Sequence, residues 1–69
     1  MTAEQAIAVA RDFARGRGYK TAAYEATATR QGAVWRVTFR PKEPKPRPGD
    51  FFSVYIDEAT SKVRLVQGK

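Results

Sequence analysis

The stretch YEATATRQGAVWRVTFR, from Tyr24 to Arg40, decides the fold because apolar and polar side chains alternate on both sides of a Gln-Gly pair. Alternation with a period of two is typical of strands that bury one face, and a short connection containing glycine is typical of a hairpin. The stretch therefore predicts two antiparallel strands, 24–30 and 33–40, joined by Gln31-Gly32.

Pairing Arg30 with Ala33 sorts the side chains of this hairpin onto two distinct faces. One face is apolar: Tyr24, Ala26 and Ala28 lie opposite Phe39, Val37 and Trp35. The other face is mostly polar: Glu25, Thr27 and Thr29 lie opposite Thr38, Arg36 and Val34. Because the apolar face needs cover from water, we predict that Trp35 packs in the core and that Arg36 faces solvent.

A second pair of strands follows at 51–56 and 62–66, joined by the turn 57–61. Pairing Ile56 with Val63 and Val54 with Leu65 places these four residues and Phe52 on a core face. The same register turns Tyr55 and Arg64 outward, together with Ser53 and Val66. Both hairpins thus offer one apolar and one polar side.

The N-terminal segment 3–15 has the spacing of an amphipathic helix. Thr2 and Gln5 are placed to form a capping box, and Gly16 and Gly18 predict that the helix stops near residue 17. Because the apolar positions are mostly alanine, a sheet can approach the helix axis closely. The apolar positions are Ala3, Ala6, Ile7, Ala10, Phe13 and Ala14.

These elements predict an α+β fold: one N-terminal helix packed on a four-stranded antiparallel meander sheet, in the order α-β-β-β-β. A length of 69 residues leaves room for one small domain, 1–69. Apolar residues make up 42% of the chain, which is compatible with a modest packed core and too high for a disordered chain.

All four prolines fall in the segment 41–50, between the two hairpins. Alternating proline removes main-chain donors and favours extended polyproline II, so we predict a charged, unpaired loop here. Pro41-Lys42-Glu43-Pro44 is a minimal PxxP pattern, which occurs often by chance. Long loops on small domains are often functional, and we expect this one to contact a partner.

Composition removes most enzyme chemistry. The chain has no Cys and no His, and so lacks thiolate ligands and both the commonest general base and the commonest metal ligand. Asp57 and Glu58 are adjacent carboxylates, but two side chains are too few for a calcium site. The pair is more typical of a turn in which Asp57 binds loop amides. We therefore predict no enzyme activity, no catalytic residue, no metal and no cofactor.

The segment VYIDEATSKV, from Val54 to Val63, resembles the closing hairpin of PepSY-type domains. In that family a hydrophobic-x-hydrophobic-Asp sequence is followed by two residues, Thr-Gly, one residue and Val. The segment from Thr2 to Ala10 resembles the family's opening helix, and Ala33 to Val37 its central strand. The chain departs from the pattern in the proline-rich loop and at Ser61, which replaces the family's glycine and puts the turn geometry in question.

The order of helix and strands, with a Val-Trp-x-Val sequence, also resembles the small immunity proteins of the nuclear-transport-factor-like and cystatin-like group. Both resemblances imply a helix packed across an antiparallel sheet in a noncatalytic protein. PepSY-type propeptide domains imply protease inhibition or regulation, and the immunity group implies toxin neutralisation. We therefore expect a protein-binding module that inhibits or regulates a partner protein.

The net charge of +6, from 13 basic and 7 acidic residues, favours an acidic partner. We expect cations of the loop and of the outer sheet face to attract it, and Phe51 and Tyr55 to supply contact area. The candidate partner-binding residues are Arg36, Arg40, Lys42, Lys45, Arg47, Phe51, Tyr55 and Arg64.

Two other functions compete with this expectation. A basic sheet face with an aromatic ring can hold phosphates and stack bases, so the alternative is a nucleic-acid-binding domain that uses Arg36, Arg64 and Tyr55. A free edge strand could instead pair two copies into a homodimer.

We expect no targeting signal in the N-terminal sequence. It has no basic region at its start, and the run from Ala6 to Ala10 is too short for a signal segment or a membrane span. We expect a cytoplasmic protein if Met1 is the native start, and an extracytoplasmic one if the chain is a domain excised from a longer protein.

Overall fold

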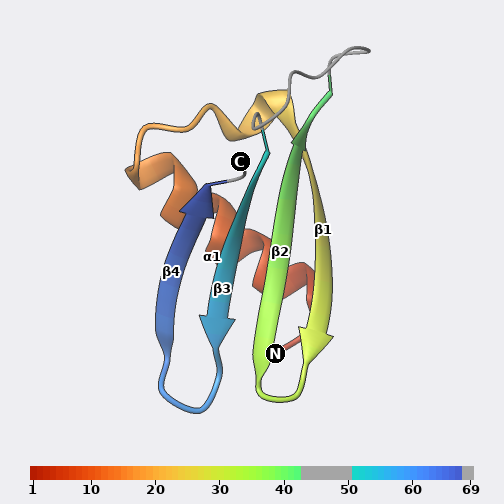
Figure 1. Cartoon of the computed structure of the whole chain (residues 1–69), viewed down its shortest axis with the longest axis vertical. Coiled ribbons are helices and arrows are strands. Elements are labelled where there is room, and N and C mark those ends of the chain that lie inside the picture. The colour runs from red at the N-terminus through yellow and green to blue at the C-terminus, as the bar shows by residue number, and fades with distance from the viewer. Residues whose placement is uncertain (43–50, 68–69) are drawn as a thin grey trace.

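One helix crosses one face of a four-stranded antiparallel sheet in the computed structural model, which describes residues 1–42 and 51–67 (Figure 1). The strands follow one another across the sheet in chain order, β1-β2-β3-β4. The predicted α+β meander is therefore confirmed. The elements are α1 (Ala3–Gly16), the short 3-10 helix η1 (Thr21–Ala23), β1 (Tyr24–Gln31), β2 (Val34–Pro41), β3 (Phe52–Asp57) and β4 (Lys62–Gln67).

Helix α1 begins at the predicted capping box. The Thr2 hydroxyl accepts a hydrogen bond from the Gln5 amide at 3.1 Å, and the Gln5 side chain accepts one from the Thr2 amide at 2.9 Å. Ala6, Ala10 and Ala14 recur every four residues along one side, and all three are fully buried. Because these side chains are single methyl groups, the helix lies close to the sheet, as its amphipathic spacing predicts.

The first hairpin forms, but its predicted register is wrong by two residues. Gln31 pairs with Val34 and Arg30 with Trp35, so the turn is Gly32-Ala33 rather than Gln31-Gly32. Gly32 has φ of +63° at the first turn position, a conformation that glycine adopts without steric cost. Because side chains repeat every two residues along a strand, a slip of two keeps each side chain on its predicted face.

The first proline of the predicted loop is part of the sheet. Pro41 is the last residue of β2 and pairs with Tyr24 of β1, and the next amide, that of Lys42, donates to the Ala23 carbonyl at 3.0 Å. Main-chain groups alternate sides along a strand, so the Pro41 nitrogen faces the β3 side. The last β2–β3 pair is Phe39 with Phe52, and proline is tolerated beyond it. The other predicted loop residues, 43–50, lie outside the described residues.

The second hairpin has the predicted register. Ile56 pairs with Val63, Val54 with Leu65 and Tyr55 with Arg64. The core is formed where the helix covers the sheet. Phe39 stacks on Phe52 with ring centroids 4.7 Å apart, and Tyr19 and Tyr24 pack on the same Phe52 ring. The buried apolar residues are Ala6, Ala10, Ala14, Trp35, Val37, Phe39, Phe52, Val54 and Ile56.

Candidate functional site

The face of the sheet opposite α1 is not covered by any of the described elements (Figure 1). We call it the open face. It carries the side chains that alternate with the core positions, and four of them are cations, against the two carboxylates of Glu25 and Asp57. The cations are Arg36 and Arg40 on β2 and Lys62 and Arg64 on β4.

Tyr55 lies at the centre of this face, between two arginines. The register places Arg36 beside it on β2 and Arg64 beside it on β4. The Arg64 guanidinium lies 5.2 Å from the centroid of the Tyr55 ring, in a cation–π contact. An open hollow of about 460 Å³ adjoins the pair, with Val34, Asp57 and Lys62 on its rim.

Arg36 is half-buried, and its Nε is buried without a hydrogen-bond partner among the described residues. The Nε of Arg11 on α1 is buried in the same way, so this feature is not specific to the open face. The neighbours of Arg36 across the sheet are Thr29 and Tyr55.

The sequence-predicted site residues are only partly brought together. Arg36, Tyr55 and Arg64 form one row across the sheet. The remaining described ones lie further along it: Arg40 near the end of β2, Lys42 one residue beyond that end, and Phe51 one residue before β3, with 43% of its surface exposed. Lys45 and Arg47 lie outside the described residues.

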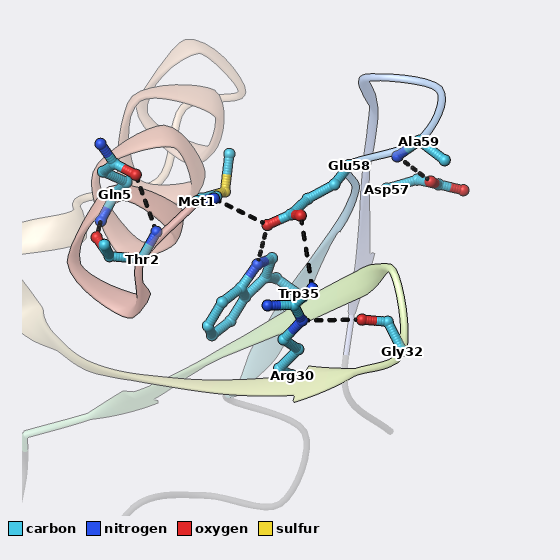
Figure 2. Close-up of polar contacts among 9 residues, drawn as sticks. All are labelled: Met1, Thr2, Gln5, Arg30, Gly32, Trp35, Asp57, Glu58 and Ala59. Carbon is cyan, nitrogen blue, oxygen red and sulfur yellow. Dashed lines mark hydrogen bonds and ion pairs between the residues drawn. The ribbon is translucent and has the colours of Figure 1, made fainter.

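Trp35 belongs to the opposite face, as predicted. It is 8% exposed and part of the core. Its indole N–H donates to the Glu58 carboxylate, a contact that the sequence analysis missed (Figure 2). Two cations complete the cluster: the Met1 α-amino group lies 3.5 Å from Glu58 Oε1, and the Arg30 guanidinium lies 3.9 Å from Oε2. Arg30 also lies over the indole ring, at 5.8 Å from its centroid.

The indole hydrogen bond is the main reason that the pKa of Glu58 lies below its ordinary value. Partial burial opposes this shift, and the Met1 amino group and Arg30 add to it. The cluster could have been found by extending the meander to the β2–β3 pair. Trp35 pairs with Ile56, and Val34 with Asp57, so Glu58 follows directly at the edge of the core.

The turn between β3 and β4 is a structural feature of the kind that the sequence predicted. The Asp57 carboxylate accepts hydrogen bonds from the amides of Ala59 at 2.9 Å and Thr60 at 3.3 Å. Ser61 has φ of +60°, the left-handed conformation that favours glycine. Ser61 therefore adopts a conformation that glycine adopts readily, at the position where the PepSY-type pattern has glycine.

Within 1–42 and 51–67, no three His, Cys, Asp or Glu residues gather in a way that could hold a metal ion. The one α-helix in these ranges is too short and too polar to cross a bilayer. The chain matches no family model, no curated protein and no solved structure. The resemblance to PepSY-type domains therefore rests only on the residues that carry it.

Proposed function

We propose that this chain is a noncatalytic binding module of the PepSY-like or cystatin-like kind, which regulates or inhibits a protein with an acidic surface. The observation that carries the proposal is the row Arg36-Tyr55-Arg64 on the open face. An aromatic ring between two arginines combines contact area with charge, and these residue types dominate the energetics of protein interfaces.

The charge of the open face supports an acidic partner. Its four cations outnumber its two carboxylates among the described residues, and the whole chain carries +6. Such a surface accelerates encounter with an anionic partner and disfavours a basic one.

Site-specific photo-cross-linking tests this proposal. A photoreactive residue replaces Thr29, which is exposed in the same row as Arg36, and a matched control replaces Ala8, which is exposed on α1. We expect a discrete protein adduct from position 29, weakened by Arg36→Glu, and none from position 8. Equal adducts from both positions, or no effect of Arg36→Glu, would contradict the proposal.

A second function is favoured by the contact between Arg64 and Tyr55. Arginine and tyrosine side by side on an exposed sheet can hold a phosphate and stack a base, so single-stranded nucleic acid is the alternative partner. Anisotropy of a labelled single-stranded oligonucleotide tests it directly. Nucleic-acid binding predicts affinity that falls steeply with salt, and the absence of binding at low salt would remove this alternative.

A further inference from the structure

The edge of the sheet at β4 differs from the edge at β1 in its surroundings. Helix α1 packs mainly against β1 and least against β4. Two hollows flank the helix side of β4 as a result. One of about 400 Å³ is lined by Val9 and Val63 together with the carboxylates of Asp57 and Glu58. The other, of about 510 Å³, is lined by Tyr19 and Leu65 together with Arg17 and Gln67.

Strand β4 also has an unpaired side. Among the described residues it pairs only with β3, which leaves a row of main-chain N–H and C=O groups facing away from the sheet. Its side chains divide sharply between the two faces. Lys62 and Arg64 lie on the open face, whereas Val63 and Leu65 lie on the helix side and are only half-buried.

We propose that the β4 edge binds an extended acidic segment of the partner as a fifth strand, an inference that rests on the proposed function. A strand added beside β4 places alternate side chains next to Lys62 and Arg64, where carboxylates are favoured. The side chains between them lie next to the half-buried Val63 and Leu65, where apolar groups are favoured. The segment that fits therefore alternates acidic and apolar residues.

Charge selects this occupant over a second copy of the chain. Two copies paired through β4 would gather four cations, Lys62 and Arg64 from each, along one ladder. Each copy also carries a net charge of +6. The same cations that block self-pairing attract an acidic strand. Asp57 faces Lys62 across the β3–β4 pair and is the one carboxylate in register with β4 on this face.

A synthetic peptide of alternating Glu and Val, blocked at both ends, tests the proposal. The matched probe has the same composition with its Glu residues in one block and its Val residues in another. We expect the alternating peptide to bind at least about tenfold more tightly, a difference of roughly 1.4 kcal/mol. Equal binding of the two peptides would overturn the alternating pattern and the strand geometry that predicts it.

Hydrogen–deuterium exchange on the same complex locates the peptide. Strand addition protects amides of β4, residues 62–67, and leaves those of the other edge strand, β1, unchanged. Binding without protection of β4 would overturn the inference, while the proposed use of the open face would stand on its own cross-linking test. A concentration-dependent dimer of the free chain with β4 protected would also overturn it, because the occupant would then be a second copy.

Two charge-reversed variants provide the matched control. Lys62→Glu with Arg64→Glu changes β4, and Arg40→Glu with Lys42→Glu makes the same change in net charge at the β1 side of the sheet. We expect the first pair to weaken the alternating peptide at least about tenfold more than the second. Equal losses would show attraction by net charge alone and would overturn the edge site.

Discussion

The two faces of this sheet are made from alternate residues of the same strands, yet they differ in composition and in burial. On β2, Trp35 is part of the core, whereas its neighbour Arg36 belongs to the open face with Tyr55 and Arg64. The helix-covered face holds the buried apolar core, and the open face holds four cations and the half-buried ring of Tyr55. We therefore expect substitutions on the open face to change the stability of the fold less than substitutions on the helix-covered face.

The largest expected effect is the difference in stability between a Trp35 variant and an Arg36 variant. Trp35→Ala removes a buried indole and its hydrogen bond to Glu58, so we expect a loss of about 3–5 kcal/mol in the free energy of unfolding. Arg36→Ala is the matched control and should change it by less than about 1 kcal/mol. Urea denaturation of both variants measures the difference, and similar losses would erase the distinction between the faces.

Overpacking the helix–sheet contact is the next test. Ala10 is fully buried against the sheet, so Ala10→Leu should cost about 1–3 kcal/mol by forcing the helix away. Ala8 is exposed on the same helix, and Ala8→Leu should be close to neutral. Thermal melts of the two variants give the comparison. A neutral Ala10→Leu would mean that the alanine stripe does not set the helix position.

A smaller effect is expected at Glu58, which joins the edge of the core to solvent. Its folded pKa lies below the ordinary value of 4.5, so the cluster stabilises the folded state above that value. This stability is lost as the pH falls through the lower folded pKa. Melting temperature followed against pH should therefore drop on the acid side, and Glu58→Gln should flatten that part of the curve. If the melting temperature of the variant falls at acid pH as steeply as that of the unaltered chain, Glu58 does not stabilise the fold in this way.

The smallest effect is expected at the β3–β4 turn, which lies outside both faces. Ser61→Gly relieves a left-handed serine, so we expect a gain of up to about 1 kcal/mol in the free energy of unfolding. Gly32→Ala is the opposite change at a glycine with φ of +63°, and it should destabilise the chain. Denaturant midpoints report both signs, and a loss on Ser61→Gly would count against strain at this turn.

Periodicity was enough to predict the helix, the four strands and the face on which Trp35, Tyr55 and Arg64 lie. A period of two does not fix which residue begins a two-residue turn. For this reason the predicted hairpin has Gly32 at the second turn position, whereas the structure has it at the first. The place of Pro41 in β2 was not predicted, because it depends on where the β2–β3 pairing ends. The contact between Glu58 and the Trp35 indole joins two different hairpins, and the pattern within one hairpin does not reveal it.

The open face was predicted in composition but only partly in arrangement. Arg36, Tyr55 and Arg64 come together because two registers, β2–β3 and β3–β4, align them in one row. The sequence analysis had derived only the second of these registers. Helix α1 contacts β1 most and β4 least, a difference that the sequence analysis did not predict.

Oxidative footprinting by hydroxyl radicals, read by mass spectrometry, tests the contrast between the two faces most directly. In an unfolded chain the indole ring of tryptophan reacts faster than the ring of tyrosine. A slower reaction of Trp35 than of Tyr55 therefore requires that Trp35 be buried. The account predicts that order, with Trp35 protected at 8% exposure, the half-buried Tyr55 modified faster than Trp35, and the exposed Phe51 modified readily. Oxidation of Trp35 as fast as in the unfolded chain, with Tyr55 protected, would contradict it.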